Sequence, residues 1–292
     1  MNTDCPDNQK QLHIAEHYGF CTGVKRAIEL FNDLVKKIKP IYVLYELVHN
    51  NDVTRNMTQN GAIFVDDVQQ VPHHATLLLG THGVPKSIIE QTKLRNLTVY
   101  DTTCPLVENL HRLAQDTTSS QQLVLFGSPG HHEAVGIIGH AGTTQTYIVT
   151  STSDIDRLPE LTNPVLLVQT TMDDDLAQSI TAHFKQRFPN AHCPSAVCNA
   201  SKKRQEAIVT LARVCDLILV VGSSHSSNAN RLCERARALG VAAKLVENSA
   251  QALDAVGDAK SIGLTAGAST PDELFQDVKN SLIKLGFRQN DN

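Results

Sequence analysis

The residues with the clearest chemical potential are three cysteines that each stand directly before an amphipathic helical pattern. They are Cys21, Cys104 and Cys198. A thiol at a helix N-terminus is readily deprotonated because the helix dipole and free N–H groups stabilise the thiolate, which is a metal ligand. The Cys-x-x-Cys pairs typical of zinc sites and ferredoxins are absent from the sequence. Spacing alone therefore leaves open that these cysteines are small buried residues rather than cluster ligands.

Three of the four remaining cysteines have a simpler interpretation. Cys215 precedes the apolar run 217–221 and Cys233 falls in a predicted helix, so we interpret both as small buried hydrophobic residues. Cys5 lies in the polar N-terminal segment. The total of seven is odd, and in a reducing compartment structural disulfides are not expected.

Composition excludes several classes of function. The net charge is −4 and aromatic residues make up 4% with no Trp, which argues against a nucleic-acid partner. No apolar run reaches the length of a membrane span, and residues 1–10 lack the pattern of a secretory signal. We therefore expect a cytoplasmic protein that binds neither nucleic acid nor membrane.

Short apolar runs alternate with helical patterns along the chain, which predicts an α/β fold with parallel strands. The predicted strands are 12–15, 41–44, 63–65, 76–79, 97–100, 123–126, 147–149, 165–168, 217–221, 243–246 and 261–264. The three helix-opening cysteines are 83 and 94 residues apart (104 − 21 and 198 − 104), about one small α/β unit each. We predict three similar small α/β domains in a pseudo-three-fold trefoil, at 12–104, 105–195 and 196–286, with tails at 1–11 and 287–292.

Four predicted strands end in short loops of glycine, hydroxyl and other small residues that open a helix. The loops are 80–83, 169–171, 222–228 and 265–269, and the segment Thr270-Pro271-Asp272-Glu273 after the last has the pattern of a capped helix start. Loops at the carboxyl ends of parallel strands lead into helix N-termini, which bind anions. Ordinary N-capping explains any one loop, whereas four with a similar layout favour an anion site.

Many short segments match one known family in order along the chain. They are Gly19-Phe20-Cys21-Thr22-Gly23-Val24 with Arg26-Ala27-Ile28, Glu46-Leu47-Val48-His49-Asn50, Thr81-His82-Gly83-Val84, Asp101-Thr102-Thr103-Cys104-Pro105, Gly130-His131-His132-Glu133, Gln169-Thr170-Thr171, Cys198 with Arg204-Gln205-Glu206-Ala207, Ser226-Ser227-Asn228-Ala229-Asn230, and Thr265-Ala266-Gly267-Ala268-Ser269. Across almost its full length the chain resembles the 4-hydroxy-3-methylbut-2-enyl diphosphate reductase (IspH/LytB) family.

This resemblance implies a [4Fe–4S] cluster at the centre of the three domains. Cys21, Cys104 and Cys198 match the family's cluster ligands. The fourth iron would have no protein ligand and would coordinate the substrate hydroxyl. Residues matching the family's pocket are His49, His82, His131, Thr170, Ser226, Ser227, Asn228 and Ser269, the last five holding the diphosphate. Glu133 matches the residue that organises proton delivery, with Thr170 as a relay and His131 beside it.

The implied reaction is the reductive dehydroxylation of (E)-4-hydroxy-3-methylbut-2-enyl diphosphate to isopentenyl and dimethylallyl diphosphates, the final step of the non-mevalonate pathway. No Gly-x-Gly-x-x-Gly fingerprint is present, so we expect electrons from a ferredoxin- or flavodoxin-like carrier. One alternative is a divergent cluster-binding paralogue that senses iron or oxygen or acts on another substrate. A zinc-dependent phosphate-ester hydrolase is the other.

A few positions depart from the family pattern or stand apart from it. His132 occupies a position where relatives often have proline, and Ser201 one where they usually have threonine. We interpret the run 202–204, Lys-Lys-Arg, as a solvated helix face that could also dock an acidic electron carrier. Four further histidines are interpreted as surface residues: His73, His74, His192 and His225.

Overall fold

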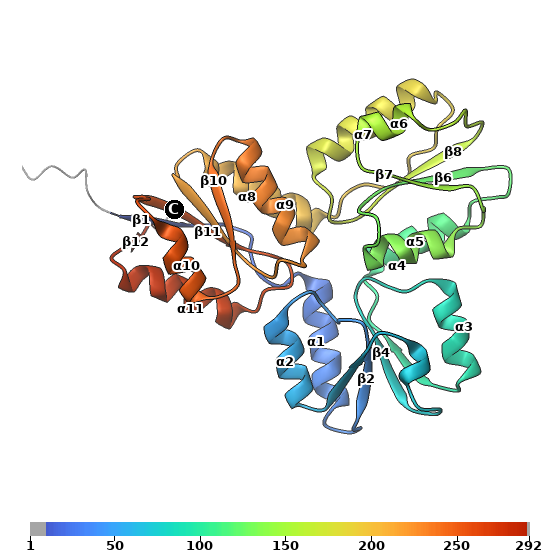
Figure 1. Cartoon of the computed structure of the whole chain (residues 1–292), viewed down its shortest axis with the longest axis horizontal. Helices are drawn as coiled ribbons and strands as arrows, with labels where there is room; N and C mark the ends of the chain where they lie inside the picture. The colour runs from blue at the N-terminus through green and yellow to red at the C-terminus, as the bar shows by residue number, and fades with distance from the viewer. Residues whose placement is uncertain (1–9, 291–292) are drawn as a thin grey trace, which may run out of the picture. The chain divides into compact units, whose positions relative to one another are not determined.

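The computed structural model describes residues 10–290. In this range the chain forms three parallel β-sheets with helices packed on them (Figure 1), which confirms the predicted α/β class. By its internal contacts the chain divides into two compact units. None of the helices within residues 10–290 combines the length and the apolar character needed to span a bilayer.

The first unit contains the N-terminal strand, residues 49–51 and the C-terminal third of the chain. Its five-stranded sheet has the order β10-β9-β11-β1-β12. The strands are β1 (Gln11–Ile14), β9 (Leu217–Val221), β10 (Ala242–Val246), β11 (Ser261–Ala266) and β12 (Arg288–Gln289), and the helices are α8 (Asn199–Ala212), α9 (Ser227–Ala238), α10 (Ser249–Val256) and α11 (Asp272–Lys284). Alternate residues of β9 face opposite sides, so Leu219 packs toward α10 and α11 whereas Ile218 packs toward α8 and α9.

Strand β1 belongs to this C-terminal sheet and not to the strands that follow it in sequence. It pairs in parallel with β11 on one side and with β12 on the other, and in Figure 1 the blue β1 lies among orange and red strands. The prediction placed this strand in the first domain, residues 12–104, whereas in the structure it pairs with strands from the C-terminal part of the chain. Pairing to a strand some 250 residues away leaves no local signal in the sequence. The remaining domain boundaries stay predictions.

The second unit contains two sheets, of order β3-β2-β4-β5 and β7-β6-β8. Their strands are β2 (Ile41–Leu44), β3 (Ala62–Val65), β4 (Thr76–Leu79), β5 (Thr98–Asp101), β6 (Gln122–Phe126), β7 (Thr146–Val149) and β8 (Pro164–Val168). The helices are α1 (Thr22–Leu34), α2 (Asn51–Gln59), the 3-10 helix η1 (Val68–Gln70), α3 (Lys86–Leu94), α4 (Pro105–Gln115), α5 (His132–His140), α6 (Thr152–Asp156) and α7 (Asp174–Arg187). Every residue of β6 and β8 is buried, because α4 and α5 cover one face of their sheet and α6 and α7 the other (Figure 1).

All eleven predicted strands are present, with ends that differ by at most two residues. The two-residue strand β12 was not predicted, since it is too short to show a period. The capped start predicted at Thr270 is wrong in detail. Helix α11 begins at Asp272 without a side-chain cap, and the Thr270 hydroxyl instead donates to the Val221 carbonyl.

Candidate functional site

The three cysteines singled out by the sequence lie where it predicts them, at helix starts. Cys21 directly precedes α1, Cys104 is the N-cap residue of α4, and Cys198 directly precedes α8. Each thiol is half-buried and outside any disulfide. By contrast, Cys215 and Cys233 are buried in a hydrophobic cluster, which confirms their structural interpretation. Cys5 lies outside the described residues.

Each of the three cysteines is anchored through its backbone N–H to a loop that follows a strand. The N–H groups of Cys21, Cys104 and Cys198 donate to the carbonyls of Ala268, Thr81 and Thr170, at 3.1, 3.0 and 3.0 Å. These acceptors belong to three of the four strand-end loops identified in the sequence. The same kind of contact therefore places each thiol next to a loop of predicted substrate-binding residues.

Two arginine side chains donate hydrogen bonds to backbone carbonyls close to the three cysteines. Arg26 on α1 donates to the carbonyl of Thr103, the residue before Cys104, at 2.9 Å. Arg204 on α8 donates from Nη1 to Ala200 O at 2.7 Å and from Nη2 to Gly19 O at 2.5 Å. The interpretation of residues 202–204 as a solvated face is thus wrong for Arg204, which is only 5% exposed.

The donor set fits an iron–sulfur cluster. Thiolates are soft metal ligands, and a helix start supplies a positive potential that stabilises them. None of the three thiols is in a disulfide or fully buried. The buried Cys215 shows the opposite environment, since burial and the adjacent Asp216 carboxylate raise its pKa to about 12. Such a thiol is a poor ligand because it holds its proton.

Glu133 and Thr170 form a buried pair in the second unit. Glu133 lies in the first turn of α5 and is 1% exposed. Its Oε1 accepts the Thr170 N–H at 2.6 Å, and its Oε2 accepts the Thr170 hydroxyl at 2.9 Å. Burial raises the pKa of Glu133 to about 7, and the two bonds from Thr170 oppose that rise. The carboxyl can consequently gain and lose a proton near neutral pH.

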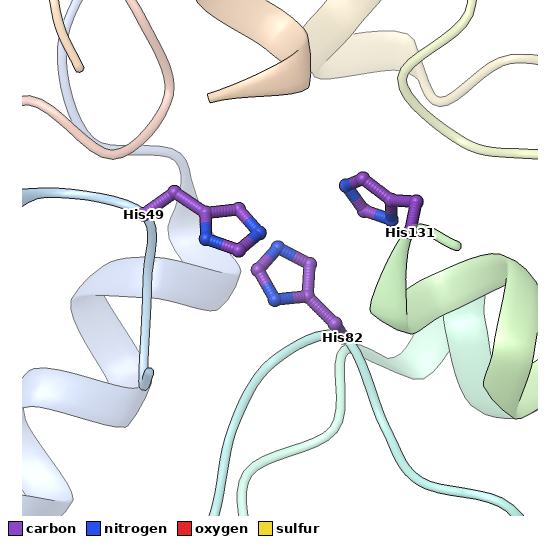
Figure 2. A group of neighbouring side chains, drawn as sticks. All are labelled: His49, His82 and His131. Atoms are coloured by element: carbon purple, nitrogen blue, oxygen red, sulfur yellow. The ribbon is translucent and has the colours of Figure 1, made fainter. Parts of the chain in front are cut away.

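Two histidines, His82 and His131, contact each other near the start of the helix that carries Glu133. Figure 2 shows His82 projecting from the loop after β4 and His131 from the N-terminal end of α5. Their ring centroids are 5.3 Å apart in an edge-to-face arrangement. The Nδ1 atom of His131 caps α5 by accepting the Glu133 N–H at 3.1 Å, so in the neutral ring the proton is on Nε2.

Gln169 is a positioning residue that sequence reasoning did not single out. It is fully buried; its Oε1 accepts the Ser128 N–H at 2.8 Å and its Nε2 donates to the Thr171 hydroxyl at 3.2 Å. Its side chain thus joins the loop before His131 to the loop of Thr170. Its place in the segment Gln169-Thr170-Thr171 was the available signal, because an amide can bridge two loops by donating and accepting at once.

The first unit carries the remaining predicted residues. Ser226 caps α9 by accepting the Ala229 N–H at 3.4 Å, and Ser227 is the first residue of that helix. Ser269 donates its hydroxyl to the His49 carbonyl at 3.1 Å, which places the His49 segment against the loop after β11. Ser226 and Ser227 thus lie at a helix N-terminus, of the kind that binds anions.

Asn228 is the most informative residue of this group. Its Oδ1 accepts the Ala268 N–H at 2.9 Å, which fixes the orientation of the amide. The side chain is 4% exposed, and in the described part of the chain no acceptor lies within hydrogen-bonding distance of its Nδ2. A buried donor left in this state costs about 1–3 kcal/mol, which a bound anion would recover.

His132, which departs from the family pattern, has a structural partner. Its ring stacks on Tyr45 with centroids 4.3 Å apart. Tyr45 directly follows β2 and has a φ of 60°, a left-handed conformation that is strained for a bulky residue. The four histidines interpreted as surface residues are indeed exposed.

A model of the LytB protein family matches residues 12–283. The chain belongs to the LytB family. It is 39% identical to the 4-hydroxy-3-methylbut-2-enyl diphosphate reductase of Haemophilus influenzae strain PittEE, over 94% of this chain and 91% of the relative. It is 40% identical to the reductase of the same name from Xylella fastidiosa strain M12, over 94% and 90%.

Solved structures agree with the LytB assignment. The structure of the E-1-hydroxy-2-methyl-but-2-enyl-4-diphosphate reductase from Plasmodium falciparum matches with a TM-score of 0.90 and 32% identity, over 97% of this chain and 92% of that one. A second structure, described as (E)-4-hydroxy-3-methyl-but-2-enyl diphosphate reductase, the terminal enzyme of the non-mevalonate pathway, matches with a TM-score of 0.66 and 26% identity. These matches confirm the resemblance inferred from the sequence motifs.

Proposed function

We propose that this LytB-family chain reduces (E)-4-hydroxy-3-methylbut-2-enyl diphosphate to isopentenyl and dimethylallyl diphosphates. The allylic C–O bond breaks, the hydroxyl leaves as water after gaining one proton, and a second proton is added to the hydrocarbon. Two electrons complete the balance, and a ferredoxin- or flavodoxin-like carrier of the cytoplasm supplies them. The names of relatives at 39–40% identity over most of both chains support this reaction.

The observation that carries the proposal is the Glu133–Thr170 pair. A leaving hydroxyl needs a proton, and the most effective acid has a pKa near the working pH. Glu133, with a pKa raised to about 7, meets that condition and bonds directly to the Thr170 hydroxyl. Glu133 therefore supplies the proton and Thr170 passes it toward the substrate, with His131 capping the helix on which the acid lies.

The ligands of the iron–sulfur cluster in this proposal are Cys21, Cys104 and Cys198. When bound, a [4Fe–4S] cluster with one iron free of protein ligands supplies electrons and a Lewis acid for the C–O bond. Support comes from the equivalent placement of the three thiols at helix starts and from the N–H anchor that each cysteine has. Arg204 and Arg26 keep two of these segments in place.

The diphosphate is bound, in this proposal, by neutral hydrogen-bond donors and histidines. Asn228 offers a buried Nδ2 without a protein acceptor, and Ser226 and Ser227 lie at the start of α9, where the helix dipole attracts anions. Ser269 and Thr170 contribute hydroxyl groups at the ends of two further strands. His49, His82 and His131 complete the proposed set of binding residues, since imidazole N–H groups donate hydrogen bonds to an anion.

The test is an anaerobic assay on the purified chain. Iron and sulfide are determined first, and the oxidation of dithionite-reduced methyl viologen is followed after addition of the hydroxylated allylic diphosphate. We expect substrate-dependent oxidation of the dye, lost in Cys104→Ser and strongly reduced in Glu133→Gln. Iron without turnover would favour the paralogue that senses iron or oxygen, and zinc without iron would contradict both readings.

A further inference from the structure

Two histidines without an assigned role lie stacked beneath the candidate site of the second unit. His111 is on α4 and His140 ends α5, and both side chains are 8% exposed. Their rings are nearly parallel, with centroids 4.1 Å apart and an interplanar angle of 11°. On α4, His111 is buried whereas Leu113 is only half-buried.

The pair contacts the loop that carries His82. His140 Nε2 lies 3.0 Å from the carbonyl oxygen of Val84, two residues after His82, and donates to it in the corresponding tautomer. The His111 ring packs directly on Gly83, where an added Cβ would lie 2.4 Å from Cε1. Gly83 also has a φ of +70°, so only glycine combines this backbone with this contact.

The same rings contact the helix that carries Glu133. A Cβ added to Gly136, one turn after Glu133, would lie 2.8 Å from His111 Nε2 and 3.7 Å from the backbone of Gly83. The loop and α5 therefore cross at two glycines, with the His111 ring wedged against both. The His111 ring therefore lies between the loop of His82 and α5.

Simple hydrophobic packing does not account for histidine at these positions. In the described part of the chain, His111 Nε2 and His140 Nδ1 are buried without a hydrogen-bond partner, an arrangement with a free-energy cost that leucine or phenylalanine would avoid. A five-membered ring is flat and smaller than phenylalanine, and it can also donate to Val84. These properties suit a spacer in a crossing that leaves no room for a larger ring.

The surroundings favour the neutral form of both rings. Burial and the neighbouring His140 lower the pKa of His111 to about 4. Burial also lowers the pKa of His140; the Val84 carbonyl and Asp101 on β5 oppose this effect, while Lys86 on α3 reinforces it. Two neutral rings can stack in contact, whereas two imidazolium ions would repel each other.

We propose that the His111–His140 pair is a positioning element that sets the separation between His82 and the N-terminal end of α5, where the N-cap residue His131 and the first-turn residue Glu133 lie. The inference rests on the proposed function, because the residues that it positions are the candidate catalytic ones. Neither ring touches the substrate in this scheme. The pair acts through the loop of His82 and through α5.

The decisive variant is Gly136→Ala, which keeps both rings and forces His111 to move. In iron-loaded protein we expect kcat to fall on the order of tenfold to a hundredfold, as for a displacement of about 1 Å at a catalytic group. KM is expected to change as well, because His82 and His131 belong to the proposed diphosphate-binding set, so the test is read on kcat. Val135→Ala, an exposed position on the same helix, is the matched control and should keep wild-type kcat.

A second variant tests whether the ring is the cause. His111→Ala removes the ring, and the double variant His111→Ala/Gly136→Ala should recover part of the kcat lost by Gly136→Ala because the added methyl group then has room. A purely structural role predicts instead that the two losses multiply. If His111→Ala fails to fold or to hold iron, Gly136→Ala and its control still decide the question.

Crystal structures separate failure of this inference from failure of the proposed function. In Gly136→Ala the centroid distance between His82 and His131 should depart from 5.3 Å, whatever reaction the protein performs. The positioning role would be overturned if this distance is unchanged in Gly136→Ala. It would also be overturned if the wild-type protein is active and Gly136→Ala keeps the wild-type kcat. A wild-type protein without substrate-dependent turnover would overturn the proposed function and leave the crystallographic comparison as the test.

Discussion

Replacing Glu133 by glutamine should stabilise the protein and remove most of its activity. Glutamine has the shape of the carboxyl: its Oε1 can accept the Thr170 N–H, and its Nε2 can donate to the Thr170 hydroxyl. The two contacts at 2.6 and 2.9 Å can therefore persist. What changes is that the buried group no longer carries a charge or delivers a proton.

The magnitude follows from the raised pKa. For Glu133 it rises from 4.5 to about 7 in the folded protein, a difference of about 2.5 units, worth about 3 kcal/mol at 1.36 kcal/mol per unit. Between these values the folded state binds more protons than the unfolded state. The contribution of Glu133 to stability is thus fully present below pH 4.5 and is lost as the pH rises through 7. Glutamine should stabilise by about 3 kcal/mol at pH 8 and by about 1 kcal/mol at pH 5.

The assay is urea unfolding of wild type and Glu133→Gln at pH 8 and pH 5, followed by kinetics of the iron-loaded proteins. We expect kcat to fall about 10²- to 10⁴-fold, the usual contribution of a general acid. Glu90→Gln, at an exposed site on α3, is the matched control and should change neither quantity. A stability gain that is absent, or equal at the two pH values, would refute the argument from burial. A variant with full activity would refute the role of Glu133 in proton delivery.

Three further substitutions test other parts of the site. Arg204→Met removes the donors that hold the segment before Cys21. We therefore expect the free energy of unfolding to fall by roughly 2–4 kcal/mol, and the iron bound per chain to drop on anaerobic reconstitution. If both values are unchanged, Arg204 does not hold this segment in place. Asn228→Ala should raise KM about tenfold, the effect of about 1.4 kcal/mol, with little change in kcat; an unchanged KM in steady-state kinetics would remove Asn228 from the diphosphate site. His132→Pro loses the stack on Tyr45, worth about 0.5–1.5 kcal/mol, but gains a residue favoured at the first helical position. The midpoint of thermal unfolding should therefore move by only a few degrees. A large decrease in this midpoint would show that the stack fixes the conformation of the Tyr45 loop.

The sequence was sufficient for features encoded locally. Strands such as β6 and β9 are continuous apolar runs, which a sheet covered on both faces requires. The cysteines at helix starts were recognisable because each stands beside a short stretch with helical periodicity. The family motifs pointed to Glu133 and Thr170, although nothing local to either residue predicts that they form a pair.

Other features depend on residues that are far apart in the chain. Strand β1 joins β11 across some 250 residues, and Arg204 is buried because its guanidinium reaches Gly19. In each case the neighbouring sequence was compatible with a different environment: a first-domain strand, or a solvated basic face. Tertiary packing decides between them.

The sequence by itself thus determined the α/β class, the elements and the set of chemically capable residues, since propensity and periodicity act over a few residues. Only the tertiary structure decided which groups are desolvated and which partners they meet. It buries Glu133 against Thr170 and raises its pKa, and it stacks His111 on His140 beneath the loop of His82. The physical reason is that burial and electrostatic environment are properties of the assembled surroundings, to which segments distant in sequence contribute.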